Sequence, residues 1–323
     1  MALRLYRYAA PGSLMLFGEH AVLHGYPALV GAVDQTITVE LKPDQQSACC
    51  QIDSHLGQAV YTLAKPIKIE PPFQYLLAII QHYQNQIQHG FTLKITSQFS
   101  STVGLGSSSA VTVAALACMH QWLGLSCQLV DLFRIARQLV RAQQGQASGA
   151  DIAASLLGGV VLFRGDLNQS ERMNVPLPNM VVVYSGSKMK TADVIRYVNA
   201  NVEQQRQCYQ DWFMQIGNIT EQAAEALCHQ NWQGFAQCLV ANQKILCQMS
   251  LNNVAIDSIV RTLTGQPGIL ACKISGSGLG DCVIGLCQPG IRPVINLSAT
   301  QQDQGMVQIG VNLSQKGLQR LDY

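Results

Sequence analysis

Residues 101–119 read STVGLGSSSAVTVAALACM and place two glycines and three consecutive serines directly before an alanine-rich segment. The Ala, Leu and Met content of residues 107–122 predicts a buried helix that begins at the serines. Serine at a helix start has two explanations. It can cap the helix through its hydroxyl, or the unpaired N–H groups and the helix dipole can bind an anion there. This stretch alone leaves both open.

The segments on either side of this stretch alternate between strand and helix patterns. FTLKITSQF (91–99) alternates apolar and polar residues and predicts a strand that leads into the glycines. Residues 129–144 have helical spacing, and 148–159 predict a short helix that ends at a glycine pair. Further strands are expected at the end of 27–41, in VVLFRG and over 179–187.

The second half of the chain has its own order of elements. Residues 190–265 are largely helical in pattern, and strands return after Pro267-Gly268 in ILACKIS, DCVIGLC and GMVQIGVNL. Mixed strands and helices in both halves predict an α+β fold. We place a domain boundary near residue 180, which gives domains 1–179 and 180–323.

Composition narrows the class of protein. The chain of 323 residues is 48% hydrophobic and only 12% charged, with a net charge of +2 and no basic run, so neither disorder nor a nucleic-acid or membrane footprint is expected. The N-terminus lacks the apolar core of a signal peptide, and no apolar run is long enough to span a membrane. The 11 cysteines contain no CxxC pair and lie mostly among apolar residues, which favours reduced thiols, with zinc binding as a minor alternative, in a cytoplasmic protein.

Three glycine-rich stretches are widely separated: 11–25, 104–110 and 275–282. Each alone is most often a simple turn. GLGSSSA matches neither the Walker P-loop nor the dinucleotide fingerprint, but the physical logic is related. Gly104 and Gly106 would let the backbone approach a phosphate, and a serine hydroxyl would be close enough to bind magnesium.

Together, in this order and spacing, the three stretches resemble those of the GHMP kinases over nearly the whole chain. The resemblance implies a two-domain α+β fold with the active site in the interdomain cleft, ATP in the N-terminal domain, and Mg²⁺. In that family the glycine loop wraps the ATP phosphates, here Gly104, Leu105, Gly106, Ser107, Ser108 and Ser109. Ser108 corresponds to the magnesium ligand, so the resemblance favours the anion site over the simple cap.

SGADIAAS resembles the family segment that carries the catalytic aspartate, here Asp151. A carboxylate suits phosphoryl transfer because it accepts the proton of the attacking hydroxyl. The structural alternative is an aspartate that stabilises a helix N-terminus.

GEHAVLHGYPAL (18–29) is most similar to the mevalonate kinase branch of the family, which implies phosphorylation of the 5-hydroxyl of mevalonate. The resemblance places Glu19, His20, Thr191, Gly276 and Ser277 on the substrate side. Taken alone, His20 is more simply a hydrogen-bonded core histidine.

Two positions depart from the family. Ser13 stands where mevalonate kinases usually have a lysine, and Val140 stands where a magnesium-binding glutamate is usual. Lys188 or Lys190 could supply the missing lysine charge. Magnesium would then depend on Ser108, the phosphates and water.

Two other functions remain open. GDC at the end of the third stretch and GADIAAS are also similar to phosphomevalonate kinases, although a phosphorylated substrate would favour more basic residues in the pocket. The two departures would also suit a non-catalytic nucleotide- or metabolite-binding protein, but such a protein would not need Asp151. The expected partners are a small-molecule substrate and ATP, and family members are often homodimers.

Overall fold

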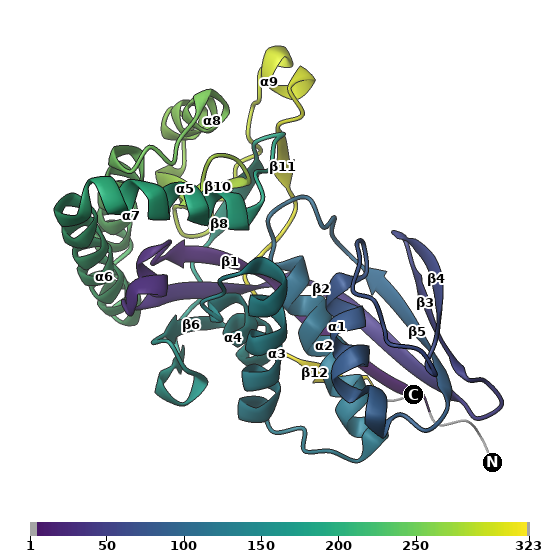
Figure 1. Ribbon diagram of the computed structural model, residues 1–323. Helices are drawn as coiled ribbons and strands as arrows, with labels where there is room; N and C mark the ends of the chain where they lie inside the picture. Colours follow the sequence, from purple (N-terminus) through teal and green to yellow (C-terminus); the bar gives the residue numbers. More distant parts are fainter. Residues whose placement is uncertain (1–4, 322–323) are drawn as a thin grey trace.

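A computed structural model describes residues 5–321 and contains two β-sheets flanked by helices (Figure 1). The first sheet has eight strands in the order β12-β1-β2-β5-β3-β4, with β6 paired to β2 and β7 to β6. Its strands are β1 (Tyr6–Phe17), β2 (Ala28–Asp44), β3 (Cys49–Ser54), β4 (Gly57–Thr62), β5 (Gly90–Ser97), β6 (Val160–Phe163), β7 (Glu171–Met173) and β12 (Gln319–Arg320). The second sheet has the order β11-β8-β10-β9. Its strands are β8 (Met180–Tyr184), β9 (Ile269–Ser275), β10 (Cys282–Cys287) and β11 (Val307–Ile309).

The helices divide into two groups along the chain (Figure 1). The first group accompanies the first sheet and comprises α1 (Gln74–Tyr83), α2 (Ser107–Leu123), α3 (Leu129–Gln144) and α4 (Ala150–Leu157). The second group comprises α5 (Thr191–Gln204), α6 (Arg206–Cys228), α7 (Trp232–Gln248), α8 (Val254–Thr264) and α9 (Ala299–Asp303). Three short 3₁₀ segments are η1 (Ala21–His24), η2 (Gln84–Gln86) and η3 (Leu167–Gln169). The α+β prediction is confirmed.

Strongly patterned segments are found where the sequence predicts them. The predicted helix 129–144 coincides with α3, and 107–122 differs from α2 by one residue. Helix α2 is buried at 11 of its 17 residues because it contacts β1 and β2 as well as α1, α3 and α4. A helix enclosed on all sides needs no polar face, which explains its alanine-rich sequence.

The sequence analysis did not predict β1, which runs through the first glycine-rich stretch. Pro11 and Gly12 obscured the strand pattern. The strand accommodates them through a register shift between Pro11 and Ser13 in its pairing with β2. Gly12 is needed here because a Cβ at this position would lie 2.6 Å from the carbonyl oxygen of Leu105.

The second sheet begins at Met180, beside the proposed boundary at residue 180. The end of the chain departs from a simple division into 1–179 and 180–323. Strand β12 returns to the first sheet and pairs with β1, and Leu313 forms a bridge to Val33. The last segment therefore ties the second half of the chain to the first sheet, and the division itself stays a prediction.

Two further features bear on the expectations from composition. All 11 cysteines are free thiols. Within residues 5–321, no helix combines the length and apolar character that crossing a bilayer requires.

The two halves of the chain meet in an aromatic contact that provides a test of the core. Phe17 of β1 and Phe235 of α7 are both fully buried, with ring centroids 5.3 Å apart in an edge-to-face arrangement. We expect Phe235→Ala to lower the free energy of unfolding by about 3–5 kcal/mol, because it leaves a cavity between the halves. Urea denaturation measures the loss. Val240→Ala on the same helix is the control, since Val240 is 58% exposed and should change little; equal effects would contradict the assignment.

Candidate active site

The glycine-rich loop before α2 forms a concave backbone site. Gly104 and Gly106 have φ angles of 68° and 64°, which favour glycine. Gly106 itself is the N-cap residue, and no side chain caps the helix, so the serine-cap explanation is wrong. Within the described residues, Ser109 and Ala110 are the first in α2 whose N–H groups donate to a backbone carbonyl, that of Gly106. The N–H groups of Ser107 and Ser108 remain available for an anion.

This loop is attached to both halves of the chain. The N–H of Ser13 in β1 donates to the carbonyl of Leu105 at 3.0 Å. The thiol of Cys282 in β10 donates to the carbonyl of Val103, also at 3.0 Å. Leu105 belongs to the loop whose backbone is predicted to hold the ATP phosphates; its side chain is buried in the core and does not line the pocket, and its carbonyl anchors the loop to β1.

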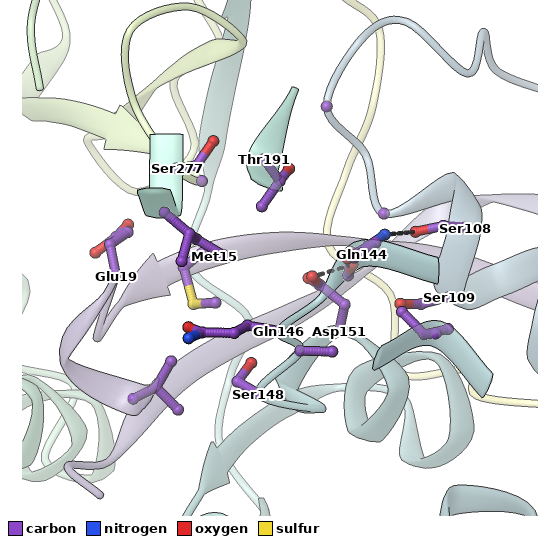
Figure 2. A pocket seen from close by; sticks show the side chains of 18 of the residues that line it. Met15, Glu19, Ser108, Ser109, Gln144, Gln146, Ser148, Asp151, Thr191 and Ser277 are labelled. Carbon is purple, nitrogen blue, oxygen red and sulfur yellow. Dashed lines mark hydrogen bonds between the residues drawn. The ribbon is translucent and has the colours of Figure 1, made fainter. Parts of the chain in front are cut away.

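Asp151 lies in the first turn of α4, and Gly149 at φ 98° is the N-cap residue of this helix. Its Oδ1 accepts a hydrogen bond of 2.8 Å from the hydroxyl of Ser13, drawn as a dashed line in Figure 2. Burial raises the pKa of Asp151, while the Ser13 hydrogen bond and the charge of Lys188 oppose that rise. The carboxylate is therefore a stronger base than a solvated aspartate and has a fixed orientation.

The two positions that depart from the family resemblance, Ser13 and Val140, line the same pocket. Ser13 is buried directly against Asp151 and provides a hydroxyl rather than a charge. Val140 adds an apolar wall. One turn later, the amide of Gln144 donates to the hydroxyl of Ser108 at 3.4 Å (Figure 2). The same amide nitrogen donates to the hydroxyl of Tyr75 at 2.8 Å. Gln144 thus holds the serine that was predicted to bind magnesium.

Glu19 faces Lys273 of β9 in a fully buried ion pair. Burial raises the pKa of Glu19 and lowers that of Lys273, and each charge opposes the shift of the other. Glu19 lines the pocket, but Lys273 already neutralises it, and its Oε2 has no partner within the described residues. Sequence analysis missed Lys273, because a lysine within ILACKIS gives no sign that it is buried.

The remaining predicted substrate residues come from three separate segments. His20, at φ 58°, forms a 2.8 Å hydrogen bond through Nε2 with the carbonyl oxygen of Ser277. Burial lowers the pKa of His20, so the imidazole is neutral and donates this bond. Gly276 and Ser277 lie on the loop after β9, and Thr191 begins α5.

One pocket gathers nearly all of these side chains between the two halves of the chain (Figure 2). The predicted residues that line it are Glu19, His20, Gly104, Gly106, Ser107, Ser108, Ser109, Asp151, Thr191, Gly276 and Ser277. Sequence analysis did not select Asp281, Met15, Gln144, Gln146 or Ser148, which also line it. Of these residues, Asp281 could have been selected from the sequence, because it belongs to the GDC triplet that ends the third glycine-rich stretch.

The pocket fits a phosphate better than a metal held by protein alone. Across residues 5–321, no group of three or more His, Cys, Asp or Glu residues is placed to hold a metal ion. Mg²⁺ keeps several waters and accepts few protein ligands when phosphates supply the rest. The hydroxyl of Ser108, beside the free amides of the loop, fits that donor set.

Comparison with family models identifies the two halves separately. Residues 74–159 match the model described as GHMP kinases N terminal domain, and residues 223–293 match GHMP kinases C terminal. The mevalonate kinase of Saccharolobus solfataricus is 25% identical over 279 residues, covering 85% of this chain and 87% of that protein. The mevalonate kinase of Archaeoglobus fulgidus is 27% identical over 300 residues, covering 92% of this chain and 98% of that protein.

Similar solved structures include kinases that act on different substrates. L. major mevalonate kinase in complex with R-mevalonate has a TM-score of 0.70 at 24% identity, covering 92% of this chain and 88% of that one. Streptococcus pneumoniae phosphomevalonate kinase has a TM-score of 0.73 at 17% identity, covering 98% and 99%. Lactococcus lactis galactokinase with galactose has a TM-score of 0.81 at 16% identity, covering 98% and 95%. These structures confirm the fold and do not choose among substrates.

The glycine loop can be tested with a matched pair of substitutions. A Cβ at Gly106 would lie 2.1 Å from the hydroxyl oxygen of Ser13, whereas a Cβ at Gly124 would meet nothing within 4 Å. Both have positive φ, so each Gly→Ala change costs about 1 kcal/mol of backbone strain. We expect only Gly106→Ala to abolish Mg–ADP binding in calorimetry. If Gly124→Ala weakens binding equally, strain alone is responsible and the assignment of the loop fails.

Proposed function

Because the chain belongs to the GHMP kinase family of small-molecule kinases, we propose that it transfers the γ-phosphoryl group of ATP to the 5-hydroxyl of mevalonate. Eight relatives named mevalonate kinase are 24–27% identical to the chain and cover 85–92% of it. The names of these sequence relatives support mevalonate as the substrate. The fold does not, because kinases of other substrates share it equally.

The observation that carries the proposed reaction is the placement of Asp151 in the same pocket as the glycine loop. Ser13 occupies Oδ1, which leaves Oδ2 without a protein hydrogen bond in the described part of the chain. Oδ2 is the atom that would accept the proton of the substrate hydroxyl. Burial strengthens Asp151 as a base, and the Ser13 hydrogen bond fixes its direction.

The rest of the pocket would position the two substrates. The free amides of Ser107 and Ser108 would bind phosphate oxygens of ATP. Ser108 would share Mg²⁺ with those phosphates, and the ion would neutralise charge on them. His20, Thr191 and Ser277 offer neutral hydrogen-bonding groups to the acceptor substrate.

Two alternatives differ in what the pocket must contain. A phosphomevalonate kinase must bind a further phosphate, yet Lys188 is the sole lysine or arginine among the described residues that line the pocket. A binding-only protein would not require the oriented carboxylate of Asp151. Both features favour the mevalonate kinase proposal.

Release of ADP from Mg–ATP tests the substrate, with mevalonate, phosphomevalonate, homoserine and galactose compared at equal concentration. We expect turnover with mevalonate alone. Turnover with phosphomevalonate instead would assign the protein to the alternative kinase. Binding of ATP without ADP release on any of the four would support the binding-only protein.

Asp151→Asn tests the proton acceptor. An amide cannot accept the proton, so kcat should fall by about 10²–10⁴-fold, while calorimetry should give nearly unchanged affinity for Mg–ADP. Ser155→Ala on the same helix is the control, since Ser155 is buried and donates to the carbonyl of Pro11 outside the pocket. Near-normal turnover of Asp151→Asn would refute the role.

The pH dependence of kcat/KM tests the environment of this carboxylate. Activity requires the ionised form, so it should be lost as pH falls through a pKa that burial raises above that of a free aspartate. Ser13→Ala removes a hydrogen bond that favours the ionised form, and the acid limb should therefore move to higher pH. A limb that stays in place or moves down would show that Ser13 does not orient Asp151.

A further inference from the structure

The pocket has little positive charge for a site that would bind a triphosphate. Within the described residues that line it, Lys188 is the single lysine or arginine. Lys188 lies between β8 and α5, and its side chain is 33% exposed. Lys190 lies two residues further along and does not line the pocket.

Lys188 faces a buried carboxylate. Its Nζ lies 3.7 Å from Oδ1 of Asp281, which is within ion-pair distance but too long for a hydrogen bond. Asp281 is only 5% exposed, and Oδ1 has no hydrogen-bond partner in residues 5–321. A buried carboxylate oxygen without a hydrogen bond costs folding free energy, and such a group in a pocket is a candidate for a functional role.

The backbone fixes the two residues relative to each other. The N–H of Asp281 donates to the carbonyl of Ser187, and the N–H of Ser185 donates to the carbonyl of Asp281, both at 2.8 Å. Asp281 adopts φ 61°, an uncommon conformation that this pair of bonds maintains. A Cβ at Gly280 would lie 2.8 Å from the Ser187 carbonyl oxygen, so glycine is required for this contact.

The Lys188–Asp281 pair also lies near the two parts of the proposed reaction centre, which are the glycine loop and Asp151. A Cβ at Gly104 would lie 3.0 Å from Oδ1 of Asp281, which places this carboxylate against the glycine loop. The charge of Lys188 lowers the pKa of Asp151 and therefore acts across the pocket. Lys188 lines the same pocket as the loop that would hold the phosphates and the proposed base.

We propose that Lys188 contacts the phosphoryl group during its transfer and that Asp281 positions Lys188 for this contact. The proposal rests on the proposed phosphotransferase function. The acceptor oxygen forms a bond to the γ-phosphorus, the bond from that phosphorus to the β–γ bridging oxygen breaks, the proton passes to Asp151, and ADP leaves. The side chain of Lys188 neutralises charge on the transferred group, which the hydroxyl of Ser13 cannot do.

Nucleotide affinity tests Lys188 without any acceptor substrate. Calorimetry compares the magnesium complexes of AMPPNP, which has a γ-phosphate, and ADP, which has none. Lys188→Met should weaken AMPPNP binding about tenfold or more, because a charge-assisted hydrogen bond is lost, and leave ADP within about twofold. Lys188→Arg should retain most of the preference for AMPPNP. Lys190→Met, an equal loss of charge outside the pocket, should change neither affinity.

Two results would overturn the role of Lys188: unchanged AMPPNP affinity in Lys188→Met, or an equal loss for both nucleotides. Because these measurements need no acceptor, they separate the two proposals. If the protein phosphorylates no acceptor but Lys188→Met loses the preference for AMPPNP over ADP, the proposed function fails. The contact between Lys188 and the γ-phosphate then still stands.

The positioning role of Asp281 predicts a split between kcat and KM. Asp281→Asn keeps the shape and tolerates positive φ, but it removes the charge that orients Lys188. We expect kcat to fall about tenfold or more, while KM for ATP stays equal or decreases because a negative charge near the phosphates is gone. An unchanged kcat, or a higher KM together with a lower melting temperature, would show that Asp281 has only a structural role.

Discussion

The buried ion pair between Glu19 and Lys273 is the contact on which the assembly of the pocket depends. Glu19 follows β1 of the first sheet, and Lys273 lies in β9 of the second. Two charges without solvent are stable only in each other's presence, and removal of one typically costs about 3–5 kcal/mol. The pair therefore fixes the start of the GEHAV segment against the strand that leads into the third glycine-rich loop. The His20–Ser277 hydrogen bond and the bond from Ser275 to the Met15 carbonyl continue this junction.

Close approach of backbone segments explains the glycines better than flexibility does. Gly12 makes room for the Leu105 carbonyl, Gly106 for the Ser13 hydroxyl, and Gly280 for the Ser187 carbonyl. The first two contacts join β1 to the glycine loop before α2, and the third joins the loop before β10 to the segment after β8. These glycines thus mark close approaches, and a Cβ at Gly12 or Gly280 would force two backbone segments apart.

Charge is sparse in the pocket and is arranged in pairs. Glu19 is neutralised by the fully buried Lys273, and the buried Asp281 is neutralised by Lys188, whose side chain is partly exposed. Asp151 has a neutral hydroxyl, that of Ser13, as its hydrogen-bond partner. A base with a neutral partner keeps more of its proton affinity than one paired with a lysine. A serine beside Asp151, where the family resemblance implies a lysine, therefore strengthens the proposed base and leaves the compensation of phosphate charge to other groups.

The sequence by itself determined the elements with strong local signals. These are the alanine-rich helix α2, helix α3 with its regular spacing of apolar residues, and the glycine loop between β5 and α2. It also predicted Asp151, His20 and Ser277 as site residues, because a motif resemblance relates chemical groups by their order along the chain. The local sequence pattern did not predict β1, because its proline and glycine are untypical of a strand. The strand forms because it pairs with β2 along most of its length, with a register shift between Pro11 and Ser13. Tertiary structure alone decided the pairings across large separations, Glu19 with Lys273, Ser13 with Asp151 and Lys188 with Asp281. A charge does not reveal its burial or its partner in sequence, since both are set by segments more than 90 residues away.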